Sequence, residues 1–229
     1  MKGPRRRQFD SDSLIPGVLE LSRAASTGSL FASSMELVRA ATDSNQTIVL
    51  VEGISDQLAL NALVRRLGWN AQAEGIAIVA MGGATNIGHF LELLLGTPGN
   101  VQMAGLCDRG EEPLFQRALE RAGLGVNLTR SQMEALGFYV CDADLEDELI
   151  RAVGVDRVLS VVAAQDDMEA FRTFQHQHAW QKQGGEAQLR RWLGAKTLRK
   201  FRYATLLVDA LDLDRIPKPL ACLLAHVRA

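Results

Sequence analysis

The stretch Thr47-Ile-Val-Leu-Val-Glu-Gly-Ile-Ser-Asp56 decides the fold, because it joins an apolar run to an acid and then to the start of a helix. A near-continuous apolar run of this length is typical of a parallel strand that is buried on both faces of a sheet. Ser55 can cap the helix that follows and Gly68 can end it. The apolar positions of this helix follow the i, i+3, i+4, i+7 rule, and they are Leu60, Leu63, Val64 and Leu67.

The same order of strand and helix recurs along the chain. Apolar strands are predicted at 75–80, 101–107 and 138–141, and amphipathic helices follow them. Such alternation predicts an α/β fold with a Rossmann-like, mostly parallel central sheet flanked by helices. We expect an N-terminal tail and helical extension over 1–45, an α/β core over 46–153, and a helical C-terminal part with a basic strip over 154–229.

Composition sets broad limits on function. The 229 residues are 47% hydrophobic and carry a net charge of −2, so nucleic acid would have to be attracted by a local basic strip or by bound cations. The three cysteines lack C-x-x-C spacing, which favours a reducing, cytoplasmic location. No run reaches the roughly 18 apolar residues of a membrane span. The basic start, Lys2 and Arg5 to Arg7, is interpreted as a solubilising tail.

Acids follow three of the four predicted strands. Glu52 comes after the first, Asp108 after the third, and Asp142 and Asp144 after the fourth. Because ligands collect at the carboxyl ends of parallel strands, these acids are expected to meet at one edge. Oxygen ligands of this kind suit Mg²⁺ or Mn²⁺, one or two ions. Asp56 can add a ligand from the next helical turn, although an acid there is also favoured by the helix dipole alone.

The third group of acids is unusually dense. Five acids lie between positions 142 and 148, namely Asp142, Asp144, Glu146, Asp147 and Glu148. Asp144 with Asp147 three residues later resembles a capping arrangement, which would make the acids structural. Their mutual repulsion nevertheless predicts raised pKa values unless a cation compensates.

Two further segments bear on phosphate chemistry. The turn Gly83-Ala-Thr-Asn-Ile-Gly88 has the glycine spacing of a P-loop, but His89-Phe90 replaces the required Lys and Ser/Thr, so only a tight turn near the edge remains. A basic strip is predicted to bind nucleic acid or, alternatively, to be a solvated face, and Lys200 within it can approach the acidic edge and stabilise a phosphoryl transition state. Its other members are Arg190, Arg191, Lys196, Arg199 and Arg202. His176 and His178 diverge on a helix and are interpreted as surface.

Taken together, Val51-Glu-Gly-Ile-Ser-Asp56, Leu106-Cys-Asp108, Asp144-Leu-Glu146 and Arg199-Lys-Phe-Arg-Tyr-Ala204 resemble the Toprim domain, most closely that of overcoming-lysogenization-defect (OLD) family nucleases. The resemblance covers roughly residues 47 to 220. It implies a parallel-sheet fold that binds Mg²⁺ or Mn²⁺ and cleaves phosphodiester bonds. By position it implies catalytic roles for Glu52, Asp108 and Lys200. The metal ligands that it implies are Glu52, Asp56, Asp108, Asp144 and Glu146.

Two departures qualify the resemblance. The second acid of the family's D-x-D pair is Gly110 here, so Glu111 or Glu112 would have to substitute in a two-metal site. The family's ABC-type ATPase does not precede the motif in this chain, which implies a standalone Toprim or an ATPase on another polypeptide. The leading hypothesis is a Mg²⁺-dependent endonuclease that acts on nucleic acid, DNA more than RNA. The alternatives are a catalytically weak Toprim module that binds nucleic acid or a partner ATPase, and a primase-like nucleotidyl transferase.

Overall fold

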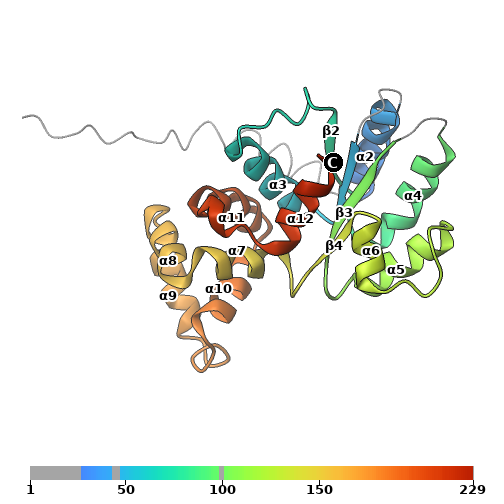
Figure 1. The fold of residues 1–229 in the computed structure, drawn as a ribbon. Helices are drawn as coiled ribbons and strands as arrows, with labels where there is room; N and C mark the ends of the chain where they lie inside the picture. The colour runs from blue at the N-terminus through green and yellow to red at the C-terminus, as the bar shows by residue number, and fades with distance from the viewer. Residues whose placement is uncertain (1–26, 43–46, 98–100, 229) are drawn as a thin grey trace, which may run out of the picture.

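The computed structural model describes residues 27–42, 47–97 and 101–228, so the basic start of the chain lies outside the described residues. Four parallel strands form one sheet in the order β2-β1-β3-β4 (Figure 1). Their bounds are β1 Thr47–Val51, β2 Ile76–Ala80, β3 Met103–Asp108 and β4 Phe138–Cys141. The predicted α/β fold with a parallel sheet is therefore confirmed.

The deciding stretch folds as a strand, a short turn and a helix, with one difference from prediction. Helix α3 spans Ile54–Arg66 and its N-cap is Gly53, so the prediction that Ser55 caps it was wrong. Ser55 is already the second helical residue and is buried, whereas Gly53 has the extended backbone of a cap. Gly68 follows the helix with a φ of +77°, a conformation that glycine adopts without strain.

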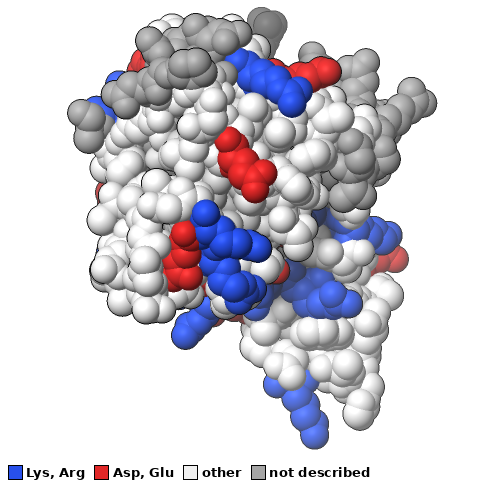
Figure 2. All heavy atoms as spheres, turned by 90° about the vertical axis from the view of Figure 1, so that its right-hand side faces the viewer, with Lys and Arg blue, Asp and Glu red and all other residues white. Residues whose placement is uncertain are grey.

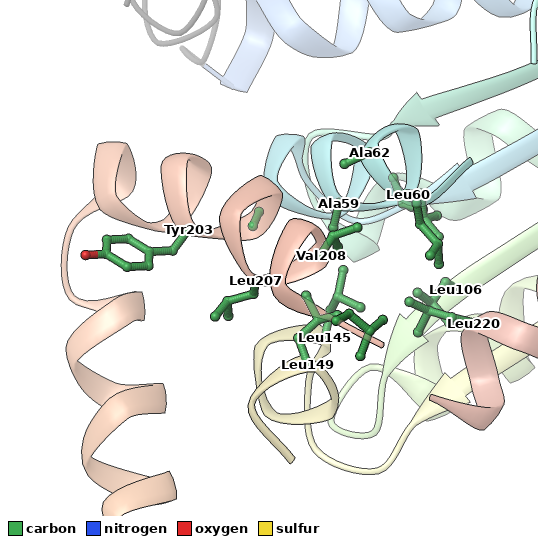
Figure 3. Close-up of a cluster of buried hydrophobic side chains, with 14 of the residues drawn as sticks. Ala59, Leu60, Ala62, Leu106, Leu145, Leu149, Tyr203, Leu207, Val208 and Leu220 are labelled. Atoms are coloured by element: carbon green, nitrogen blue, oxygen red, sulfur yellow. The ribbon is translucent and has the colours of Figure 1, made fainter. Parts of the chain in front are cut away.

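Helices cover both faces of the sheet and enclose two apolar cores. One face carries α2 (Thr27–Thr42), α4 (Ile87–Gly96), α5 (Glu112–Arg121) and α6 (Arg130–Ala135). The other carries α3, α7 (Leu145–Val153), α11 (Thr197–Ala210) and α12 (Lys218–His226). Figure 3 shows Leu60 of α3, Leu145 of α7 and Val208 of α11 in one buried cluster with Leu106 of β3. This packing brings α11 against α3 next to the first acid, although Arg66 of α3 and Val208 of α11, which contact each other, are 142 residues apart in sequence.

The predicted helical C-terminal part also contains α8 (Val155–Ala164), α9 (Met168–Gln175) and α10 (Gly185–Gly194), which lie away from the sheet beyond α7 and α11 (Figure 1). Trp192 links them to α11, because its ring lies edge-on to Phe171 at 5.3 Å and to Tyr203 at 5.6 Å. These rings belong to the same buried cluster as the sheet residues. The division of the chain at residues 45 and 153 stays a prediction.

None of the helices in the described ranges is both long and apolar enough to cross a membrane. The cytoplasmic location remains a prediction from the cysteine content.

Candidate active site

Glu52 is held at the carboxyl end of β1 by the glycine turn that follows β2. The backbone N–H of Gly83 donates to the Glu52 carbonyl at 3.0 Å, and the N–H of Met81 donates to the Val51 carbonyl at 2.8 Å. Gly83 has a φ of +128°, which other residues adopt only with strain. The glycine turn therefore has a structural role beside the acid. Burial, with the nearby charges of Asp56 and Glu111, raises the pKa of the Glu52 carboxyl.

Asp56 reaches the same edge from the first turn of α3. Its Oδ2 accepts from the backbone N–H of Gly53 at 2.9 Å, and the Ser55 hydroxyl lies 3.5 Å from Oδ1. The carboxylate thus stabilises the helix start, as the alternative interpretation expected. Burial nevertheless raises its pKa in spite of these contacts and of the Lys200 ammonium. Asp56 therefore contributes both to the helix start and to the acidic edge.

Asp108 lies at the carboxyl end of β3, and its pKa is strongly raised. It is the last residue of β3 and pairs in register with Cys141 of β4. Its pKa is raised to about 8, mainly by burial and then by the negative charges of Asp56, Asp144, Glu52 and Glu146, in that order. Acids from β1, α3, β3 and the start of α7 therefore lie within electrostatic reach of one another.

Lys200 supplies the positive charge of this edge. Its Nζ lies 3.3 Å from Oε1 of Glu146, whose side chain is only 10% exposed. Burial raises the pKa of Glu146 to about 7 although Lys200 opposes the shift. Burial lowers the pKa of Lys200, but Glu146, Asp56 and Asp108 raise it by more, so the ammonium stays charged. The structure thus places Lys200 among the acids, as the sequence predicted.

The acids between positions 142 and 148 contact different partners. Asp144 is the N-cap of α7: its Oδ1 accepts from the N–H of Asp147 at 2.8 Å, and its Oδ2 pairs with Nε of Arg190 at 2.6 Å. Glu148 is buried, accepts from the N–H of Asp142 at 2.8 Å and pairs with Arg151 at 2.9 Å.

Arg151 compensates the repulsion in this segment. Its guanidinium also lies 2.8 Å from Asp147 and 3.6 Å from Asp142. The predicted repulsion is therefore relieved by a cation of the chain itself. Sequence reasoning missed Arg151, although its spacing of three and four residues from Glu148 and Asp147 on one helix was a usable signal.

Much of the basic strip is engaged within the protein. Arg190 pairs with Asp144, Arg202 pairs with Asp167 at 2.9 Å, and Arg199 stacks 3.8 Å from the Trp192 ring centroid. Two members, Arg191 and Lys196, are exposed and have no ion pair with any described residue. Nucleic-acid binding by the strip remains a prediction that rests chiefly on these two side chains.

The acidic edge has the donor chemistry of a hard divalent cation. Its side chains offer only oxygen ligands, and burial, together with repulsion among these acids, raises the pKa values of Glu52, Asp108 and Glu146 in spite of Lys200. Among the described residues, however, no three His, Cys, Asp or Glu side chains are arranged to hold one ion as they stand. The residues therefore fit Mg²⁺ or Mn²⁺ by their chemistry, and a bound ion requires side-chain adjustment. His176 and His178 are exposed and lie away from this edge.

Part of the chain matches the model of a known protein family. Residues 45–109 match the family model described as overcoming lysogenization defect protein-like, TOPRIM domain. The chain contains an OLD-like Toprim domain. This match ends at Arg109, so it includes Glu52, Asp56 and Asp108 but not the later acids or Lys200.

Solved structures extend the similarity of fold beyond that match. The C-terminal region of the Burkholderia pseudomallei OLD protein is 22% identical, with a TM-score of 0.57, and covers 80% of this chain and 96% of that one. Two structures of the C-terminal region of the Xanthomonas campestris pv. campestris OLD protein are 26% and 23% identical, with TM-scores of 0.59 and 0.62. They cover 80% of this chain and 94% and 92% of their own. No curated protein matches the chain. The OLD-like assignment made from the motifs is thus confirmed.

Proposed function

We propose that this Toprim domain is a divalent-metal-dependent nuclease that cleaves nucleic-acid phosphodiester bonds, DNA more than RNA. The observation that carries the proposal is the convergence of Glu52, Asp56, Asp108 and Glu146 on one sheet edge with Lys200 in their midst. OLD-like Toprim domains belong to a family typical of nucleic-acid cleavage, which supports the same chemistry.

Each side chain has a defined part in this proposal. Glu52, Asp56, Asp108, Asp144 and Glu146 would hold one or two Mg²⁺ or Mn²⁺ ions. A metal held there supplies activation of a water and stabilisation of the leaving oxygen. Lys200, which stays charged at neutral pH, neutralises negative charge on the phosphoryl group. Asp144 reaches a metal only by exchanging its contact with Arg190.

Glu111 is proposed to replace the second acid of the D-x-D pair, because Gly110 occupies the position of that acid in this chain. Its charge is among the causes that raise the pKa of Glu52, so its carboxylate lies within electrostatic reach of the first acid. Glu112 is less suited, because it forms a two-point ion pair with Arg130 that lowers its pKa. We therefore include Glu111, and not Glu112, in the metal-binding set.

Plasmid nicking with Mg²⁺ or Mn²⁺ tests the proposal. Glu52→Gln keeps the shape of the side chain and removes its charge, so it is expected to abolish nicking. Glu169→Gln, a change of the same kind at an exposed position on α9, is the matched control and is expected to leave nicking unchanged. Equal nicking by the wild-type protein and Glu52→Gln in contaminant-free preparations would overturn the proposal.

A second candidate is a catalytically weak Toprim module that binds nucleic acid or a separate ATPase subunit. Gly110 favours it, as does the contact of Arg190 with Asp144, which occupies a carboxylate expected to bind metal. Calorimetry with Mn²⁺ separates the two candidates. Binding accompanied by cleavage supports the nuclease, whereas the absence of both supports the module.

A further inference from the structure

A cavity on the β4 side of the sheet is lined by none of the acids proposed to hold metal. It has a volume of about 570 Å³, which is within the usual range for pockets that take a small ligand. It lies along the open edge of β4, which is the last strand of the sheet and has α6 and α12 on either side (Figure 1). Asp142 belongs to its lining and is two residues from Asp144, so the cavity adjoins the proposed active site.

Two cations in the lining are free to bind an anion. Arg215 and Lys218 are exposed and form no ion pair within the described part of the chain. They flank Pro217, whose ring restricts the backbone between them, and α12 begins at Lys218. The other two cations of the lining are engaged, Arg130 with Glu112 and Arg151 with the acids of α7.

Two other side chains of the cavity lining can form hydrogen bonds with a ligand. Glu134 of α6 carries no ion pair to any described residue, so its carboxylate is available as an acceptor. Tyr139 of β4 is half-buried, and its hydroxyl forms no hydrogen bond to another described residue. A simple anion such as phosphate would leave Glu134 unmatched, whereas a ligand with an anionic group and N–H or O–H donors would satisfy all four side chains.

We propose that this cavity binds a nucleotide, with its phosphate on Arg215 and Lys218 and its base or sugar on Tyr139 and Glu134. Phosphate is well matched to arginine and lysine, an aromatic ring offers a face to a base, and a carboxylate accepts from an exocyclic amine. The inference deepens the proposed function, because the nucleotide can be one that adjoins the cleaved bond in a nucleic-acid strand. A free mononucleotide has the same chemistry and is the other source.

Binding is measured first in EDTA, where no cleavage occurs. The probes are the four 5′-mononucleotides by calorimetry and a labelled single-stranded oligonucleotide by anisotropy at several salt concentrations. Arg215→Ala/Lys218→Ala is expected to weaken binding at least about tenfold and to reduce the log–log salt slope for the single-stranded oligonucleotide by about 1.4. The matched control is Arg172→Ala/Lys182→Ala, which removes the same charges at exposed positions of α9 and the following loop. Glu134→Gln is expected to change the preference among the four bases.

The outcomes distinguish a nucleotide of a strand from a free mononucleotide, and they distinguish the cavity proposal from the nuclease proposal. Loss of oligonucleotide binding alone identifies a strand nucleotide, and loss of mononucleotide binding alone identifies a free one. Equal binding by Arg215→Ala/Lys218→Ala and its control, with both probes, overturns the inference. If binding depends on Arg215 and Lys218 but the wild-type protein never nicks DNA, the cavity proposal stands and the nuclease proposal falls. If the wild-type protein nicks DNA and the cavity variant matches its control, the reverse holds.

Discussion

Replacing Lys200 with methionine should destabilise the metal-free protein by an amount that grows with pH. Lys200 Nζ lies 3.3 Å from Glu146 Oε1, and the Glu146 carboxyl already has a pKa of about 7 with the lysine present. Removing the ammonium raises that pKa further. Because the side chain of Lys200 is 34% exposed, solvent screens the contact, and we expect a further rise of about 1 to 2 units rather than the full buried-pair value.

The direction of this pH dependence follows from the number of protons that the folded and the unfolded states bind. In the unfolded chain Glu146 has the ordinary glutamate pKa of 4.5, so above that pH the folded variant holds a proton that the unfolded chain has lost. Stability then falls as pH rises, by at most about 1.4 kcal/mol per pH unit. At pH 5.5 Glu146 is protonated in the folded state of both proteins, and the expected loss is below about 0.5 kcal/mol. At pH 9 it is about 2 kcal/mol, since each unit of pKa displacement costs about 1.4 kcal/mol.

Urea unfolding in EDTA at pH 5.5, 7 and 9 measures this free energy by linear extrapolation. Lys196→Met, an exposed lysine just before α11, is the matched control and should show no such pH dependence. In a Glu146→Gln background the effect of Lys200→Met should also lose its pH dependence. An equal loss at pH 5.5 and pH 9, or an unchanged loss in the Glu146→Gln background, would refute the reasoning.

Two further predictions concern other parts of the same edge and sheet. Asp108→Asn should stabilise the metal-free protein, and more so as pH rises from about 4 toward 8. The wild-type carboxyl has a folded-state pKa of about 8, so in this range the folded protein keeps a proton that the unfolded chain loses, which lowers the stability of the wild type but not of the asparagine variant. Melting temperatures in EDTA at pH 5.5 and 8.5 measure this gain, and an equal gain at both pH values would contradict the prediction. Gly137→Ala should cost about 2 kcal/mol or more, because the residue has a φ of +89° and a Cβ there would lie 2.9 Å from a backbone carbonyl of β3. Gly96→Ala, where a Cβ meets nothing within 4 Å, is its control in urea unfolding, and equal stabilities would show that the strand start tolerates a side chain.

The distribution of surface charge affects how nucleic acid would approach the protein. Figure 2 shows that the face carrying α4 and α5 has small mixed groups of basic and acidic side chains rather than a continuous basic surface. Steering of nucleic acid by the whole protein is therefore weak on this face, in keeping with the net charge of −2. Local contacts at the acidic edge and the β4 cavity carry the proposed recognition instead.

The strands and the acids at their ends were predictable because they depend on local patterns. Apolar runs of the right length predicted all four strands to within two residues, and parallel strands bring their carboxyl ends together whatever the details of packing. The cap of α3 was not predicted correctly, because Gly53 and Ser55 are both acceptable caps and the turn after β1 decides between them.

The sequence by itself determined the order of strands and helices, the positions of Glu52, Asp56 and Asp108, and the resemblance to OLD-like Toprim domains. The tertiary structure decided which of the later acids join them. Glu146 points toward Lys200, whereas Asp144 contacts Arg190 and Glu148 contacts Arg151. The partners of Asp144 and Glu146, Arg190 and Lys200, come from α10 and α11, about 50 residues away in sequence, whereas Arg151 lies on α7 itself. Only the packing of α10 and α11 against α7 and α3 brings Arg190 to Asp144 and Lys200 to Glu146.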